Sequence, residues 1–264
     1  MPQPHNIPNT PEDRKEWLKN LANRNTVLNG GAGAVYFYGD KTDPKKLEVM
    51  VTHRHKDVGE GLANFGGLRE DEDIVKGKPL QTALNNVERE GEEELEEILG
   101  FKPDLKQDQF TYLYTTHDDV FFTNHGKGFA IDAYLFCYAM DDKLYTNLFP
   151  NGEKESLRVD NANQEEETVK TERMPLYDAL KLGDKYKYPH EYFSLWVMTA
   201  KVLKLDVVKL AKELGTDFTH IAKQMDVSVS KLEEFLGNTY KGKLDNNSNT
   251  NSRSVNDKKN TPNL

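Results

Sequence analysis

The chain has 264 residues, a formal net charge of −9 and an isoelectric point near 5.4. This acidity argues against a broad surface for nucleic acid or for an anionic membrane. The single cysteine, Cys137, excludes an internal disulfide framework and suits a reducing compartment. No run approaches the ~18 apolar residues of a membrane span, and the first residues lack the apolar core of a signal peptide. We therefore expect a soluble, cytoplasmic protein with no membrane partner.

The first part of the chain predicts an arm, a helix and a hairpin. Four prolines make residues 1–11 an irregular arm, and a short helix is predicted over 11–23 with Thr10 as its N-cap. The apolar runs 32–38 (AGAVYFY) and 47–53 (LEVMVTH) are separated by turn-forming residues. We expect these two runs to pair as a β-hairpin.

A glycine-rich connection and an acidic helix follow. Residues 59–67 (GEGLANFGG) are predicted to connect the hairpin to a loop over 68–79, and residues 83–100 are predicted to form a helix. Four carboxylates share one face of this helix: Glu90, Glu93, Glu94 and Glu97. Residues that can be buried lie on the opposite face: Leu84, Val87, Gly91, Leu95 and Ile98. A run of charges such as this one can simply be a solvated face of the helix. Because the carboxylate row contains no lysine to balance it, a divalent cation site, most naturally for Mg²⁺, also fits.

The Gly66-Gly67 pair could supply main-chain carbonyl oxygens to the same cation as these carboxylates. Without a Cβ, a glycine turn lets the backbone approach a ligand closely, and its carbonyls are hard oxygen donors. Mg²⁺ bound in this way keeps several waters and completes its shell with substrate phosphates. It neutralises phosphoryl oxygens and activates a bound water. The reaction class that fits is attack of water on a phosphoric anhydride.

Two segments together resemble the Nudix box, namely FGGL at residues 65–68 and REGEEE at residues 89–94. The resemblance covers about residues 25–182. It implies an α+β fold in which a mixed β-sheet is sandwiched between helices. It also implies hydrolysis of a pyrophosphate linkage in a nucleoside-diphosphate-linked compound, such as a nucleotide, a dinucleoside polyphosphate or a nucleotide sugar.

The same resemblance implies roles for individual residues. Glu90, Glu93 and Glu94 would bind Mg²⁺ or Mn²⁺, joined by the Gly67 carbonyl, while Arg89 would orient the carboxylates through charge-assisted hydrogen bonds. Glu93 or Glu94 would accept the water proton. A later carboxylate from residues 165–167 (EEE) is another candidate base, and a solvated run is the alternative interpretation of that triplet.

The chain departs from the family motif at several positions. The loop before Arg89 is eight residues longer, and Gln81 stands where the motif has its first glutamate. That acid must therefore come from residues 70–73 (EDED) or be absent. Glu96 replaces the terminal glycine, so the helix is expected to continue to Gly100, a better C-cap. Gly91 replaces a larger apolar residue and predicts close packing of the helix onto the sheet.

Three aromatic residues are candidates for contacting the substrate. Tyr112 and Tyr114 lie where dinucleoside-polyphosphate hydrolases carry a base-stacking tyrosine, and by strand alternation they are expected to share one face. Phe121 follows in the predicted loop 116–127 and could line the nucleobase side. Ordinary core or rim positions are the alternative for these aromatics.

The rest of the chain predicts further strands, helices and a tail. Strands are predicted at 109–115, 129–140 and 165–173, a turn-rich segment at 141–164, and helices at 175–182 and 190–214. The predicted domain organisation is an arm (1–11), a Nudix-like domain (12–185), a helical extension (186–243) and a disordered tail (244–264).

Residues 217–236 resemble a helix-turn-helix, which allows a rival function. A metabolite sensor that regulates transcription would use such a module, but the second helix carries one Lys and two Glu and suits phosphate poorly. A helical hairpin packed on the helix containing Trp196 explains the same apolar positions. A third possibility is a Nudix scaffold that binds a partner without catalysis.

Overall fold

The computed structural model describes residues 28–54, 61–122, 128–157, 168–225 and 227–242. The predicted arm, the predicted helix at 11–23, the glutamate triplet at 165–167 and the predicted tail lie outside the described residues. In the described ranges no helix has the length and apolarity that crossing a membrane requires.

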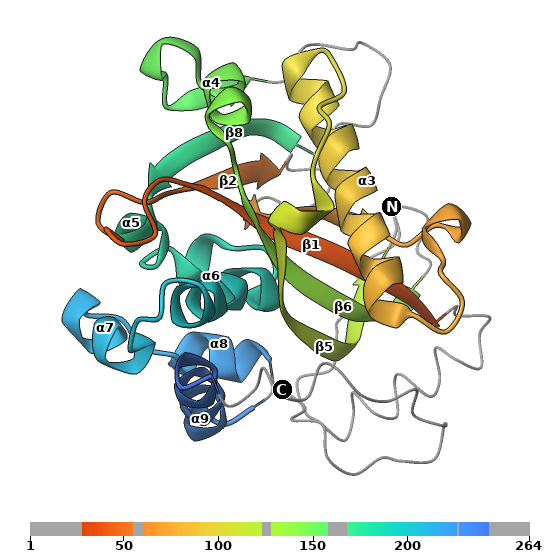
Figure 1. The fold of residues 1–264 in the computed structure, drawn as a ribbon. Coiled ribbons are helices and arrows are strands. Elements are labelled where there is room, and N and C mark those ends of the chain that lie inside the picture. The colour runs from red at the N-terminus through yellow and green to blue at the C-terminus, as the bar shows by residue number, and fades with distance from the viewer. Residues whose placement is uncertain (1–27, 55–60, 123–127, 158–167, 226, 243–264) are drawn as a thin grey trace, which may run out of the picture.

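A mixed sheet of eight strands forms the centre of the described molecule (Figure 1). The long strand β1 (Leu28–Tyr38) runs parallel to β6 (Gly128–Ala139) on one side. On its other side the first half of β1 pairs with β4 (Phe65–Leu68), and the second half pairs with β2 (Glu48–Arg54), both antiparallel. The predicted hairpin of the first two strands is thus confirmed.

The remaining strands extend this centre in both directions. β5 (Phe110–Phe122) forms an antiparallel pair with β6 at one edge. β8 (Thr168–Pro175) pairs with β2, and β7 (Glu155–Leu157) pairs with β8 at the other edge. The short strand β3 (Gly61–Ala63) pairs with the end of β2. The sheet order is β5-β6-β1-β2-β8-β7, with β3 and β4 off this path.

Helices cover both faces of the sheet. Helix α3 (Pro79–Leu99) lies on one face and α6 (Pro189–Lys201) on the other (Figure 1). The described part contains five more α-helices: α4 (Asp142–Leu148), α5 (Leu176–Ala179), α7 (Val207–Leu214), α8 (Thr219–Gln224) and α9 (Val229–Tyr240). This arrangement confirms the predicted α+β class, with a mixed sheet between helices.

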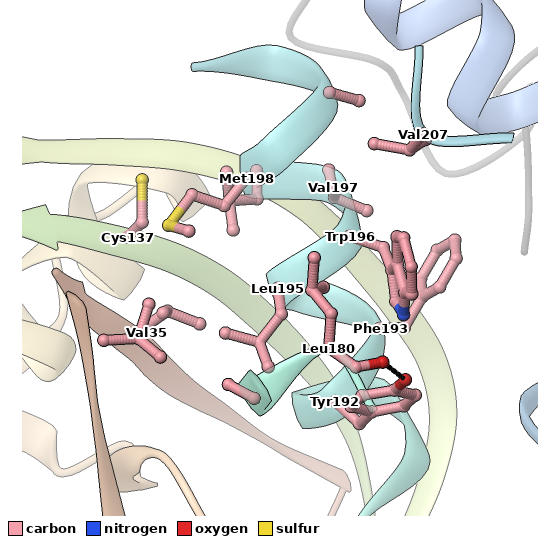
Figure 2. Close-up of a cluster of buried hydrophobic side chains, with 14 of the residues drawn as sticks. Val35, Cys137, Leu180, Tyr192, Phe193, Leu195, Trp196, Val197, Met198 and Val207 are labelled. Atoms are coloured by element: carbon pink, nitrogen blue, oxygen red, sulfur yellow. Dashed lines mark hydrogen bonds between the residues drawn. The ribbon is translucent and has the colours of Figure 1, made fainter. Parts of the chain in front are cut away.

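Both faces of β1 are buried because its side chains alternate between two cores. Ala34 and Tyr36 join the core under α3, whereas Val35 and Phe37 join the core under α6. Figure 2 shows this second core, in which Val35 and side chains of α6 lie close together. The sequence run 32–38 is therefore apolar throughout, as a strand buried on both faces requires.

Helix α3 ends at the predicted C-cap but begins at Pro79, earlier than the predicted residue 83, so the predicted start is wrong. Pro79 occupies the first turn, where the missing N–H costs nothing, and Gly100 adopts a left-handed C-cap with φ of 73°. The Gly100 N–H donates to the Glu96 carbonyl at 2.8 Å. The predicted continuation of the helix to Gly100 is confirmed.

The C-terminal helices pack on α6 as a compact group. The rings of Trp196 and Phe218 meet edge to face with centroids 5.1 Å apart. Leu232 and Leu236 of α9 are fully buried in the same core as Trp196. The predicted packing of a helical hairpin on the helix containing Trp196 is confirmed.

Two further predicted boundaries are wrong. The single helix predicted at 190–214 is two helices, α6 and α7, because Lys204 turns left-handed at φ 54° and the Asp206 carboxylate caps α7. The loop predicted from residue 116 is strand up to Phe122, because pairing with β6 supplies hydrogen bonds that override the polar composition.

Two segments expected to lack regular structure also contain short elements. The connection predicted at 59–67 consists mainly of β3 and β4, which pair with β2 and β1. The turn-rich segment 141–164 contains α4, capped by Asp141, and the edge strand β7. Such short elements depend on tertiary partners and leave little periodicity in the sequence.

Candidate functional site

The Gly66-Gly67 pair lies in β4, directly against β1 and α3. A Cβ on Gly66 would lie 2.3 Å from the carbonyl oxygen of Ala32, and a Cβ on Gly67 would lie 2.1 Å from Oε2 of Glu90. At Gly66 the obstacle is main chain and φ is 155°, so only glycine fits there, whereas the obstacle at Gly67 is the end of the Glu90 side chain, which can move. The main chain of β4 therefore lies directly beside the Glu90 carboxylate of α3.

The three glutamates predicted as ligands make different contacts. Glu90 is largely buried and faces Gly67, with its side chain 17% exposed. Glu94 accepts a hydrogen bond from the Gly66 N–H through Oε1 at 3.0 Å. Glu93 is more open to solvent, with its side chain 53% exposed. Two of the three thus pack against the glycine pair, and the third faces outward on the same helix.

Arg89 links these glutamates to the loop before α3. Its Nη1 donates to Glu93 at 3.1 Å, and its Nη2 lies 2.9 Å from Oε1 of Glu90. Nη2 also donates to the carbonyl oxygen of Leu68, the residue after Gly67, at 3.1 Å. The Arg89 side chain is only 11% exposed, so these bonds form where solvent competes weakly.

Among the four acids of residues 70–73, Asp73 makes the shortest contacts with Arg89. Its two oxygens accept from Nε and Nη2 of Arg89 at 3.2 and 3.1 Å. Its side chain is 3% exposed, and it also accepts the Glu70 N–H at 2.8 Å. The sequence left this acid open among residues 70–73. The structure places Asp73 in contact with Arg89, because a 3₁₀ turn at Asp71–Asp73 folds the longer loop back onto α3.

The site carries a large excess of negative charge. Besides Asp73, Glu90 and Glu93, two further carboxylates lie 3.9 Å from the guanidinium of Arg89, those of Glu70 and Glu72. Burial raises the pKa of Glu90 to about 7, and Arg89 offsets this only in part because Glu93 and Glu70 oppose it. One guanidinium does not neutralise five carboxylates, so the site attracts cations.

The residue types present fit a hard divalent cation, whereas their arrangement is that of an ion-paired cluster. Carboxylates and a main-chain carbonyl are the ligands that Mg²⁺ and Mn²⁺ prefer. Within the described ranges, no three Asp, Glu, His or Cys side chains are grouped so as to hold a metal ion. Arg89 engages oxygens of Glu90 and Glu93, so a cation bound there would have to replace those ion pairs.

The predicted aromatic residues do not form one surface. The expectation that Tyr112 and Tyr114 share a face is wrong, because the pairing of β5 with β6 shifts register between them. Tyr112 packs against Phe136 on the α3 side, with ring centroids 5.7 Å apart. Tyr114 is buried on the α6 side and donates to the carbonyl oxygen of His190 at 2.5 Å. The side chain of Phe121 lies outside the described residues.

Asn86 is a polar residue of this region that the motif does not predict. It is buried in α3 one turn before Glu90, and its Nδ2 donates to the carbonyl oxygen of Leu68 at 3.2 Å. The signal in the sequence was an asparagine between Ala83 and Val87 on the otherwise apolar side of the helix. Leu68 thus accepts bonds from both Asn86 and Arg89.

No protein-family model matches the sequence, and no curated protein matches it. Solved structures do resemble the chain. An Ap4A hydrolase from C. elegans is 15% identical, with a TM-score of 0.36 and coverage of 67% of this chain and 99% of that one. A NUDIX hydrolase from Alicyclobacillus acidocaldarius is 15% identical, with a TM-score of 0.42 and coverage of 73% and 97%.

A third match is the NUDIX domain of NrtR from Shewanella oneidensis, in a structure complexed with ADP-ribose. It is 16% identical, with a TM-score of 0.33 and coverage of 64% of this chain and 86% of that one. The solved structures that this chain resembles therefore include Nudix proteins, all at low sequence identity.

Proposed function

We propose that this protein is a Nudix-type hydrolase that cleaves a pyrophosphate linkage in a nucleoside-diphosphate-linked compound, using Mg²⁺ or Mn²⁺. One observation carries the proposal. The Gly66-Gly67 pair and the carboxylates of α3 lie against each other, with Glu94 bonded to the Gly66 N–H and Glu90 in contact with Gly67. This contact between two separate segments supports the proposal, because the box motif implies that both segments supply ligands to one cation.

In this proposal, different residues of the site bind the cation, position the carboxylates and accept the proton. Glu90, Glu93, Glu94 and the Gly67 carbonyl would hold the cation, which supplies positive charge to phosphoryl oxygens and lowers the pKa of a bound water. Arg89 positions the carboxylates, and Glu93 or Glu94 takes the water proton. Support for the positioning role comes from the bonds of Arg89 to Glu93 and to the carbonyl oxygen of Leu68.

The proposed substrate is a small molecule that joins a nucleoside diphosphate to another group. Tyr112 is the better candidate of the two tyrosines for a stacking contact, because it is only partly buried at the α3 side of the sheet. Tyr114 fills the other core and does not support that role. Nucleic acid is not the proposed partner, since the chain carries a formal net charge of −9.

A nucleotide-binding protein without catalysis is the second candidate. It is favoured by the ion pairs that Arg89 makes with Glu90 and Glu93, because these oxygens are already engaged. The two candidates make the same prediction for binding and opposite predictions for turnover. They are therefore separated by an activity measurement and not by affinity.

The test is a chromatographic screen for nucleotide products over nucleoside triphosphates, ADP-ribose, dinucleoside polyphosphates and NAD, with added Mg²⁺ and then Mn²⁺. We expect turnover of at least one compound, lost upon chelation. Glu93→Gln and Glu94→Gln should lower kcat by roughly 10²-fold or more. Glu96→Gln, at an exposed position of the same helix, is the matched control and should leave kcat unchanged.

Two outcomes would contradict the proposal at different levels. If wild-type protein turns over none of these compounds but binds one of them, the non-catalytic candidate holds. If turnover occurs and neither glutamine variant changes it, the assignment of the site is wrong. A shift of duplex DNA at moderate salt would instead support the transcriptional regulator.

A further inference from the structure

The strands β3 and β4, which lead into the glycine pair, are inserted between β1 and β2. β3 pairs with the end of β2 through Ala63 and Thr52, and β4 pairs with β1 through Phe65 and Ala34. Asn64 is the residue between β3 and β4, and it is 5% exposed. Because the main chain changes its partner strand at Asn64, the peptide group before this residue sets the direction in which β4 begins.

Side chains from two different elements hold the peptide group between Ala63 and Asn64. The Thr52 hydroxyl, from β2, donates to the carbonyl oxygen of Ala63 at 2.8 Å. The N–H of Asn64 donates to Oε2 of Glu191, in the first turn of α6, at 3.0 Å. A hydrogen bond to a carboxylate is stronger than one between neutral groups. Both polar atoms of this peptide group are therefore fixed by side chains that lie outside β3 and β4.

Further bonds attach this part of the chain to the beginning of α6. Nδ2 of Asn64 donates to the carbonyl oxygen of Glu191 at 3.2 Å and to Oγ of Ser194 at 3.0 Å. The segment before α6 adds a main-chain bond, from the Lys187 N–H to the carbonyl oxygen of Leu62 at 2.8 Å. The bend between β3 and β4 is thus held by α6 at several points.

The bend lies two residues before the proposed cation site. The main chain of Gly66 packs tightly on β1, and its N–H donates to Oε1 of Glu94 at 3.0 Å. Phe65, the residue between, is 1% exposed in the core under α3. A buried ring and a tightly packed glycine leave little room for local adjustment. A rotation of the peptide group before Asn64 would therefore move Gly66 and Gly67 relative to the carboxylates of α3.

Glu191 belongs to the helix layer opposite α3, since α6 and α3 cover different faces of the sheet (Figure 1). An acid in the first turn of a helix is stabilised by the helix dipole, which would account for Glu191 without any role at the site. That alternative does not require the carboxylate to accept a main-chain N–H from another segment, as Glu191 does.

We propose that Glu191 is a positioning residue of the cation site, because by holding the peptide group before Asn64 it sets the place of Gly66 and Gly67 opposite the carboxylates of α3. This inference rests on the proposed function and deepens it, since it extends the site to a residue of the other helix layer. Residues that orient metal ligands without touching the metal typically change metal affinity by about 10- to 100-fold when they are replaced.

The first test measures binding of Mn²⁺ alone to the full chain, from the electron paramagnetic resonance signal of the free ion. Glu191→Gln retains an acceptor oxygen for the Asn64 N–H, whereas Glu191→Met has a side chain of similar length without one. Both variants remove the same charge, so their difference reports the hydrogen bond. We expect Glu191→Met to bind Mn²⁺ about 10-fold more weakly than Glu191→Gln. Leu236→Ala, buried in α9, is the control for lost stability and should bind Mn²⁺ as wild type does.

The second test follows amide hydrogen exchange without any metal. The Gly66 N–H should exchange about 10-fold faster in Glu191→Met than in Glu191→Gln, because its bond to Glu94 is no longer held in place. In Leu236→Ala, faster exchange should be spread over the amides of the core and not concentrated at Gly66. Thr52→Val removes the other bond to the same peptide group and should act in the direction of Glu191→Met, also if that variant does not fold.

The outcomes separate this inference from the proposed function. If Glu191→Met and Glu191→Gln bind Mn²⁺ equally, or if their Gly66 amides exchange equally, Glu191 serves only the fold and the inference is overturned, whatever the enzyme does. If wild type binds no Mn²⁺, the cation site fails and the inference fails with it. If the two variants differ as expected but wild type cleaves no pyrophosphate compound, the inference stands and the proposed function fails.

Discussion

Arg89 is surrounded by carboxylates from two segments, the loop before α3 and α3 itself. Its bonds to Asp73 close the loop, and its bonds to Glu93 and Leu68 reach the helix and the end of β4. A guanidinium can make these bonds at once because its five donors lie in one fixed plane. Lysine offers one point charge and would lose most of them.

Replacing Asp73 tests how much its ion pair with Arg89 contributes to the free energy of unfolding. Asp73→Asn leaves Arg89 without its most buried counter-ion, and we expect the free energy of unfolding to fall by about 2–4 kcal/mol. Asp71→Asn, in the same turn but exposed, should change it by less than ~0.5 kcal/mol. Urea denaturation in EDTA measures both. Equal effects of the two variants would show that the Asp73–Arg89 pair does not hold the loop.

The raised pKa of Glu90 predicts how stability depends on pH without divalent cations. Its pKa is about 7 in the folded chain and near 4.5 when unperturbed, so the folded chain binds more protons between these values. Stability must then fall as pH rises from about 4.5 to about 7, by up to ~3 kcal/mol from this group. Glu90→Gln should flatten this part of the curve of unfolding free energy against pH in EDTA, and an unchanged slope would contradict the shift.

At the scale of elements, α3 is held unusually close to β1. A Cβ on Gly91 would lie 2.1 Å from the hydroxyl oxygen of Tyr36 and 3.0 Å from Cδ1 of Leu105. The Tyr36 hydroxyl is buried and has no hydrogen-bond partner among the described residues. Burial, with nearby Tyr138 and Glu94, raises the pKa of Tyr36 well above its ordinary value, so the phenol stays neutral. The close approach brings the carboxylates of α3 to β4.

Gly91→Ala should therefore destabilise the protein although alanine is the better helix former. We expect a loss of about 1–3 kcal/mol from overpacking, against a gain of about 1 kcal/mol for an open helix position. Gly237→Ala in α9, where no atom lies within 4 Å of the added Cβ, is the control and should stabilise. Thermal and urea unfolding measure both.

A double variant identifies the clash. Tyr36→Phe removes the hydroxyl oxygen that a Cβ at Gly91 would meet, so it should recover part of the stability lost in Gly91→Ala. The Leu105 contact remains, which is why recovery is expected to be incomplete. If the two substitutions are simply additive, the hydroxyl is not the obstacle.

At the scale of the whole molecule, one core joins the sheet to the C-terminal helices. Val35 of β1 and Leu236 of α9 belong to the same buried cluster, with Trp196 of α6 between the two layers. We propose that the boundary near residue 185 separates a Nudix-like segment from a helical extension along the chain, while both share this core. Unfolding of the described part should then be cooperative.

Leu232→Ala tests whether the sheet and the C-terminal helices share one core. The Leu232 side chain is fully buried in α9, so the cavity should lower the free energy of unfolding by about 2–5 kcal/mol. Because the core is continuous, tryptophan fluorescence and far-ultraviolet circular dichroism should still report one transition, shifted together. Glu234→Gln, exposed on the same helix, should leave the midpoint unchanged. Two separated transitions in Leu232→Ala would indicate that the extension unfolds on its own.

The sequence alone was sufficient for features that depend on local spacing. The helical period of the carboxylates predicted the acidic face of α3, and the apolar run at 32–38 predicted a strand that pairs with the next one. Gly100 could be chosen as the helix end because the left-handed cap strongly favours glycine. These features rest on interactions between residues that are near in sequence, so composition and period determine them.

Contacts between distant segments were decided only in the tertiary structure. Four acids in residues 70–73 are equivalent in sequence, and only the folded loop brings Asp73 to Arg89. Tyr112 and Tyr114 alternate in sequence, but a register shift against β6 sends them to opposite cores. Asn86 in α3 bonds to the carbonyl oxygen of Leu68 in β4, a partner that its place in the sequence does not indicate. Each of these follows from a long-range pairing, and no local pattern records which partner a side chain will meet.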